Sequence, residues 1–159
     1  MRVSSSGRRP AGPEVVIGAD PFRRPNPRLA VALARAGALA VLDLDGTGRD
    51  ADRLAEVAGR VPDGFAVRPR TPADLTGLTL PPQATTVVAS GPGAAAGIAG
   101  AGGAAGTSRV AGRRLVVEVT SVAEAEAAFE AGAEGLVVVG SESGGRVGEV
   151  EAFILLQLL

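Results

Sequence analysis

The alternation of short apolar runs with stretches of helical periodicity is the feature that most restricts the fold of this chain. The apolar runs are continuous, which is typical of strands buried on both faces of a sheet. Parallel strands need a crossover connection, and a helix usually provides it. The sequence therefore predicts a parallel α/β sheet that is covered by helices.

The predicted elements follow one another from residue 15 to the end of the chain. The expected strands are residues 15–18, 38–44, 65–68, 85–89, 114–119 and 135–139. The expected helices are residues 27–36, 49–60, 71–75, 93–106 and 122–131, and a last helix from about residue 149. We expect Asn26 to cap the first helix, and Thr120 or Ser121 together with Glu124 to cap the helix at 122–131.

Two architectures are compatible with this order of elements: a (β/α)₈ barrel and an open doubly wound sheet. Short strands, short loops after them and the absence of an early GxGxxG motif favour the barrel. A complete barrel takes about 250 residues, whereas this chain has 159 and ends in the apolar segment 153–159. We therefore expect an incomplete TIM-barrel type domain of about six βα units at 14–159, after a flexible lead-in at 1–13.

Composition excludes several classes of function. The chain contains no Cys and no His, which removes thiolate chemistry, disulfides and the usual metal ligand and neutral-pH base. Its net charge of −1 gives no field that would attract nucleic acid. No apolar run approaches the roughly 20 residues that span a bilayer, and the first residues do not resemble a signal peptide. A cytoplasmic location is the expectation.

A glycine-rich loop near the end of the chain is the strongest candidate for a site. Residues 135–149 read GLVVVGSESGGRVGE, which is an apolar strand, a polar loop and the expected start of a helix. Such a turn presents backbone N–H groups to an anion, and glycines such as Gly144 and Gly145 allow a ligand to approach the backbone closely. With no His or Cys beside it, this loop indicates binding more than catalysis.

The same residues resemble a known family. Residues 132–146 resemble the "GADAIVVQGxEAGGH" segment of nitronate monooxygenases, the 2-nitropropane-dioxygenase-like flavin barrels. Residues 26–42 resemble the "NPxLAAAVARAGGLGVL" segment that comes early in that family. Residues 117–121 and 146–149 are similar to the version found at the front of some polyketide-synthase-type proteins.

This resemblance implies a TIM barrel that holds FMN at the carboxyl ends of its strands and oxidises a small organic molecule. Its cofactor-binding residues are implied to be Gly18, Ala19, Gly140, Ser141, Gly144 and Gly145. Glu142 and Arg146 are implied to face the substrate.

The chain departs from the family in two ways. Members that oxidise nitroalkanes use a His as base, whereas this chain has no His and carries Arg146 where many relatives have one. The later strands, whose glycine loops surround the FMN phosphate in the family, are absent from the sequence. The expected function is therefore a nitronate-monooxygenase-like oxidoreductase domain that is truncated and inactive alone. The alternative is a non-catalytic, barrel-derived module of a polyketide-synthase-type assembly, which packs against further domains or forms a homodimer.

Two glutamates are candidates for a general base. Glu118 and Glu142 lie at or near predicted carboxyl ends of strands, where barrel sites are built. A carboxylate there acts as a base when burial raises its pKa. The competing interpretation is a solvated carboxylate in a loop or near a helix N-terminus.

The remaining charged candidates have simpler interpretations. Asp43 and Asp45 could hold a hard cation, but a turn before Gly46 is favoured, and we expect no metal. Arg146 is suited either to a phosphate or carboxylate or to an ion pair with Glu142 or Glu149. The arginine pairs at 23–24 and 113–114 are expected to be solvated flanks.

Overall fold

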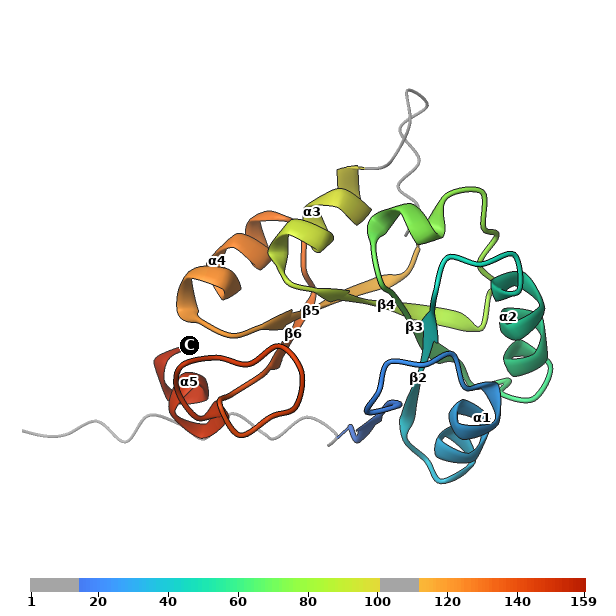
Figure 1. Cartoon of the computed structure of the whole chain (residues 1–159), viewed down its shortest axis with the longest axis horizontal. Helices are drawn as coiled ribbons and strands as arrows, with labels where there is room; N and C mark the ends of the chain where they lie inside the picture. The colour runs from blue at the N-terminus through green and yellow to red at the C-terminus, as the bar shows by residue number, and fades with distance from the viewer. Residues whose placement is uncertain (1–14, 101–111) are drawn as a thin grey trace, which may run out of the picture.

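The computed structural model of the chain describes residues 15–100 and 112–159. It contains one curled sheet with helices along its convex side (Figure 1). The strands are β1 (Ile17–Gly18), β2 (Leu39–Leu44), β3 (Phe65–Pro69), β4 (Ala84–Ser90), β5 (Arg114–Val119) and β6 (Gly135–Val138). The lead-in predicted at 1–13 and the part of the predicted Ala/Gly-rich helix at 101–106 lie outside the described residues.

The helices alternate with the strands as the sequence predicts. They are α1 (Pro27–Arg35), α2 (Asp50–Ala58), the 3₁₀ helix η1 (Pro72–Leu75), α3 (Pro92–Gly100), α4 (Val122–Glu130) and α5 (Ala152–Leu158). The side chain of Asn26 accepts a hydrogen bond from the N–H of Leu29, at 3.1 Å, which confirms the predicted cap of α1. Ser121 caps α4 in the same way through Glu124, at 3.2 Å.

Strand order distinguishes the two predicted architectures. All neighbouring strands are parallel, and their spatial order β1-β2-β3-β4-β5-β6 is the order along the chain. A doubly wound sheet reverses its strand order at a switch point, and this sheet does not. The prediction of an incomplete TIM-barrel type fold is therefore confirmed.

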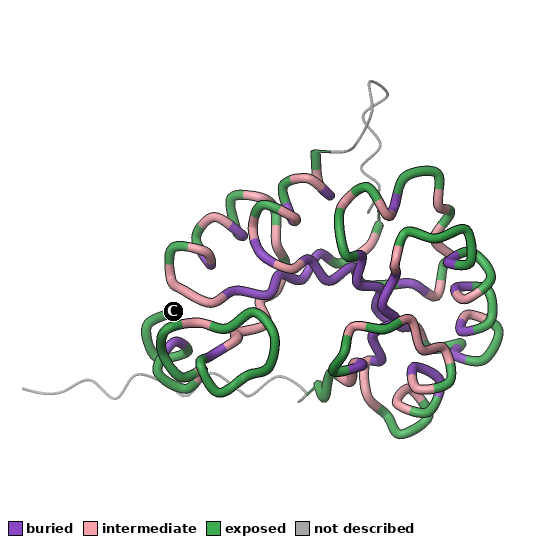
Figure 2. Tube along the Cα trace, in the orientation of Figure 1, coloured by how far each residue is buried: buried purple, intermediate pink, exposed green. Residues whose placement is uncertain are grey.

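The two faces of the sheet carry different residues because successive side chains of a strand point to opposite sides. The convex face packs against the helices through a large apolar cluster that includes Leu42, Phe65 and Val117, all fully buried. The concave face has a small apolar patch of Val41, Ala66 and Val88. Figure 2 shows the strands as a nearly continuous buried band.

The segment between β6 and α5 differs from the prediction. The sequence predicts a helix from about Glu149, whereas α5 begins at Ala152. The residues in between form a closed loop, in which the N–H of Ser141 donates to the carbonyl of Val150 at 2.9 Å. The carboxylate of Glu142 accepts the N–H of Ala152 at 3.0 Å. The chain thus turns back on itself before the helix begins.

Within residues 15–100 and 112–159, no helix has the length and hydropathy needed to cross a membrane.

Candidate functional site

Three charged side chains from three strands meet on the concave face near the carboxyl ends of the strands. Asp43 of β2 lies opposite Arg68 of β3 in the strand register, and Glu118 comes from β5. Arg68 donates to both carboxylate oxygens of Asp43, at 2.7 and 3.2 Å, and to Glu118 Oε1 at 2.8 Å. All three residues are buried. A single buried guanidinium therefore bridges two buried carboxylates, Asp43 and Glu118.

Arg23 extends this cluster from the loop after β1. Its guanidinium donates to Glu118 Oε2 and to Ser90 Oγ, both at 2.6 Å. Its backbone φ is +52°, and Arg23 is the one non-glycine residue in the described ranges with a positive φ. Backbone strain of this kind persists where surrounding contacts enforce it. The expectation that Arg23 is a solvated flank is wrong, because it links the first strand to β4 and β5.

The electrostatic environment keeps Glu118 ionised. Burial alone would raise the pKa of Glu118, but Arg23 and Arg68 outweigh burial and hold that pKa below its usual value. For Asp43, burial has a larger effect than the contact with Arg68, so the pKa of Asp43 is raised above its usual value. A general base works best with a pKa near the working pH, and the lowered pKa of Glu118 lies further from neutral pH than that of a free glutamate.

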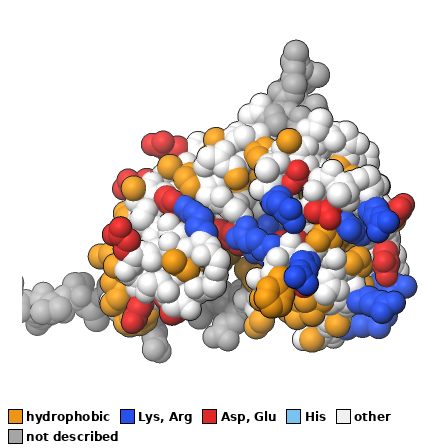
Figure 3. All heavy atoms as spheres, in the orientation of Figure 1, with side chains coloured by type: hydrophobic (Ala, Val, Ile, Leu, Met, Phe, Trp, Pro, Cys, Tyr) orange, Lys and Arg blue, Asp and Glu red, His pale blue; other side chains and the backbone are white. Residues whose placement is uncertain are grey.

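A cavity of about 250 Å³ lies beside this cluster. Its lining comes from the β1–α1 loop, from β3 and β5, from the end of β6 and from the loop after β6. The lining residues are Ala19, Asp20, Pro21, Arg23, Arg68, Glu118, Val137, Val138, Val139, Ser143, Gly144 and Arg146. Figure 3 shows basic and acidic side chains gathered side by side over the middle of the molecule. Because the sheet curls, segments that are more than 100 positions apart in the sequence line one cavity.

Four of the predicted site residues meet at this cavity: Ala19, Glu118, Gly144 and Arg146. The other five, Gly18, Gly140, Ser141, Glu142 and Gly145, do not line it. Gly18 lies under α1, where an added Cβ would come within 2.7 Å of the Leu33 side chain. Gly145 has a φ of +83°, which favours glycine at that position of the loop.

Gly140 and Glu142 hold the start of α5. Gly140 is buried, and a Cβ on it would overlap the backbone N of Ala152 and the Glu142 carboxylate. Glu142 is exposed and accepts the N–H of Ala152. Both residues therefore have packing and capping roles that the sequence does not reveal.

Arg146 pairs with neither of the predicted partners, Glu142 and Glu149. Its guanidinium forms an ion pair with Glu124 in the first turn of α4 and donates to the carbonyl of Glu118 at 3.5 Å. Glu124 also accepts the N–H of Thr120, at 2.8 Å. Arg146 therefore ties the loop after β6 to the start of α4.

Asp43 and Asp45, the weaker candidates of the sequence, have separate partners. Asp43 accepts from Arg68 at 2.7 Å, whereas Asp45 accepts from Thr47 and Arg53 at 2.6 and 2.8 Å. The hydrogen bonds from Thr47, together with the hydrogen bond and charge of Arg53, lower the pKa of Asp45 to about 2. No group of three or more His, Cys, Asp or Glu side chains suited to a metal ion occurs in the described part of the chain.

Arg113 was expected to be a solvated flank, but its guanidinium donates to the carbonyls of Ala84 and Leu80, both at 2.8 Å. These hydrogen bonds therefore hold in place the segment that leads into β4.

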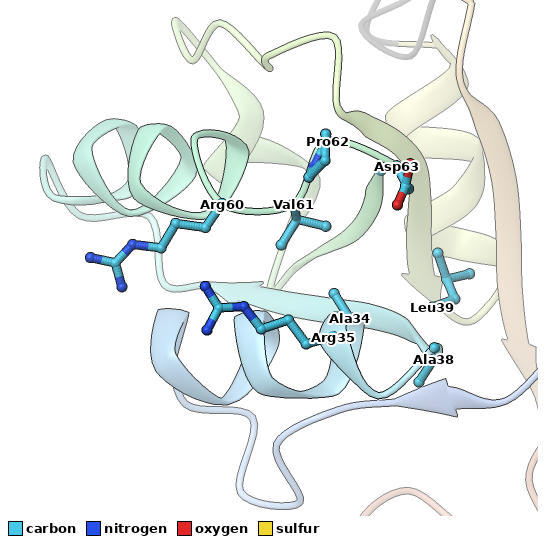
Figure 4. A pocket seen from close by; sticks show the side chains of 10 residues that line it. Ala34, Arg35, Ala38, Leu39, Arg60, Val61, Pro62 and Asp63 are labelled. Carbon is cyan, nitrogen blue, oxygen red and sulfur yellow. The ribbon is translucent and has the colours of Figure 1, made fainter.

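A second pocket, of about 400 Å³, lies at the opposite end of the strands, between the ends of α1 and α2 (Figure 4). Its lining includes Ala38, Leu39, Val61 and the arginines Arg35 and Arg60. This end of a barrel contributes to stability, while active sites are built at the carboxyl ends of the strands. The smaller cavity beside Arg68 is therefore the better candidate for a functional site.

These features define a class: an incomplete parallel (β/α) barrel of six strands, with a charged cluster and a cavity at the carboxyl ends of its strands. No protein-family model matches the sequence, and no curated protein matches it. Among solved structures, the fold is similar to FabK from Thermotoga maritima, with a TM-score of 0.72 and 23% sequence identity. The match covers 91% of this chain and 46% of FabK, so the chain spans about half the length of that protein.

Proposed function

We propose that this chain is the N-terminal part of a flavin-dependent oxidoreductase barrel of the nitronate-monooxygenase-like type. The main support for this proposal is that Ala19, Gly144 and Arg146 line the same cavity. The sequence resemblance independently assigns Ala19 and Gly144 to the flavin side and Arg146 to the substrate side. Ala19 follows the first strand of the sheet, whereas Gly144 and Arg146 follow the last. The three residues therefore meet only because the sheet curls.

The fit to FMN is partial. A volume of about 250 Å³ is below the roughly 300–1,000 Å³ of typical ligand pockets. Barrels commonly bind phosphate with the loops after a seventh and an eighth strand, and the described residues form six. We infer that these residues line the edge of the flavin ring and the adjoining substrate, and that the phosphate is held elsewhere.

When bound, FMN supplies the redox chemistry by taking electrons from a small organic substrate. The chain's own residues position the ligand. Ala19 and Gly144 leave room for a flat ring, while Arg68 and Arg23 fix Glu118 at the floor of the cavity. Arg146 offers a guanidinium, which does not accept protons, so it cannot replace a His as a base.

Titration of FMN fluorescence with the purified chain tests this proposal. We expect saturable quenching that is lost in Ala19→Phe, which fills the cavity, and kept in Ala38→Phe, which alters the second pocket. No quenching up to about 1 mM, equivalent to a binding free energy weaker than about −4 kcal/mol, would count against the proposal.

A second candidate rests on the exposed apolar residues at the two edges of the sheet. Val16 at the β1 edge is 69% exposed, and Phe153 and Leu158 of α5 are 65% and 61% exposed. These residues suit a non-catalytic module that packs against a partner domain or a second copy of the chain. Concentration-dependent association in sedimentation, together with no flavin binding, would favour this candidate; a monomer that binds flavin would exclude it.

A further inference from the structure

The loop at residues 141–150 forms one wall of the cavity through Ser143, Gly144 and Arg146. Residues 141–147 are all exposed on the molecular surface. In Figure 1 this loop faces the β1–α1 segment across the concave side of the sheet. A movement of the loop tip would therefore change access to the cavity directly.

The base of the loop is fixed. The N–H of Ser141 donates to the carbonyl of Val150, at 2.9 Å, which joins the two ends of the loop. Gly148 packs so closely that an added Cβ would come within 2.6 Å of the carbonyl oxygen of Thr120. A compact surface loop of this length whose ends lie close together is an Ω-loop, a type of loop that is frequently functional.

The side chain of Arg146 ties the tip to α4 and β5, whereas the carboxylate of Glu142 and the N–H of Ser143 bond within residues 140–152. Arg146 reaches across to Glu124 of α4 and to the carbonyl of Glu118. The two charged side chains of this ion pair are 39% and 25% exposed. Exposed ion pairs are weak and are screened by salt, so the contact is strong enough to bias the loop and weak enough to break reversibly.

We propose that residues 141–150 are a hinged wall of the cavity, latched shut by the Arg146–Glu124 ion pair, and that release of this pair opens the cavity. The latch does not depend on which ligand the cavity binds. A failure of flavin binding would therefore leave it intact, and a failure of the latch would leave the flavin proposal intact.

Hydrogen exchange of the backbone amides at 143–147 tests the latch. We expect Glu124→Gln and Arg146→Gln each to speed exchange there by about two- to five-fold. The double variant should show no further increase, because both changes break the same pair. In the unmodified chain exchange should rise with salt, whereas in the variants it should not.

Two control variants separate the latch from the cap of α4. Thr120→Val removes a hydroxyl that donates to Glu124 at 2.9 Å and keeps the ion pair, so exchange at 143–147 should be unchanged. Glu126→Gln removes an exposed charge from the same helix and should also have no effect. Unchanged exchange in Arg146→Gln, or additive effects in the double variant, would overturn the proposal.

A single introduced thiol reports opening of the cavity itself, because the chain has no cysteine. Ala19→Cys places a thiol in the wall opposite the loop. Its alkylation rate should rise two- to five-fold when Glu124→Gln is added. The rate for Ala38→Cys in the second pocket should not change. Equal rates for Ala19→Cys with and without the latch would also overturn the proposal.

Discussion

Replacing Arg68 with methionine is expected to lower the free energy of unfolding by about 3–5 kcal/mol, measured by denaturant titration. The change leaves two buried carboxylates, Asp43 and Glu118, without the guanidinium that bridges them at 2.7 and 2.8 Å. Breaking a buried ion pair by removing one partner is costly because the remaining charge is desolvated. Arg23 still contacts Glu118, so Asp43 bears most of the loss.

The matched control is Arg70→Met, two residues along the chain at an exposed position. It should change stability by no more than about 0.5 kcal/mol. Adding Asp43→Asn and Glu118→Gln to Arg68→Met should restore much of the lost stability, because neutral side chains cost less to bury. A loss in Arg68→Met no larger than in Arg70→Met would show that the cluster is solvated.

Gly140→Ala is the second large effect that we expect, with a loss of about 1–3 kcal/mol in the free energy of unfolding. The added methyl group would overlap the backbone N of Ala152 and the Glu142 carboxylate, so the start of α5 must shift. Overpacking against backbone is poorly relieved because the neighbouring atoms cannot rotate away.

Gly144→Ala is the control for this change. It lies in the same loop, but no atom lies within 4 Å of the added Cβ, so stability should change by less than about 0.5 kcal/mol. The pair also tests the two roles offered for Gly140. If Gly140 were mainly a flavin contact, Gly140→Ala would weaken FMN binding and leave the stability of the free chain unchanged.

The sequence predicted the strands, the helices and the type of fold correctly because these features depend on residues that are close together along the chain. Apolar runs predicted the strands, and the Asn26 and Ser121 caps predicted the starts of α1 and α4. The choice between a barrel and an open sheet also followed from local features, since short strands and connections were sufficient to favour it.

The charged cluster was not predictable in this way, although a signal was present. Asp43 and Arg68 are each the single charge of an otherwise apolar strand, and Glu118 interrupts the apolar run of β5 after Arg114 at its start. Their meeting depends on the register of the strands and on the direction in which the sheet curls. The contact of Arg23 with Glu118 joins residues 95 positions apart, and no local pattern encodes it.

The structure of the glycine-rich loop was also only partly predictable from the sequence. Its composition predicted a turn correctly, but not which glycine would face the cavity. Gly144 lines the cavity, whereas Gly140 packs under α5 because Glu142 folds back to the N–H of Ala152. The partner of Arg146 was missed for a similar reason, since Glu124 lies in an earlier βα unit.

The central claim is that the cavity beside Arg68 is the ligand-binding site of this incomplete barrel. Backbone amide chemical shifts, followed by NMR during addition of FMN, test it most directly. The account predicts that shifts will change at residues 19–23 and 137–146, with little change at residues 34–39 and 60–64. Changes confined to the second pocket, or none at any concentration of FMN, would contradict it.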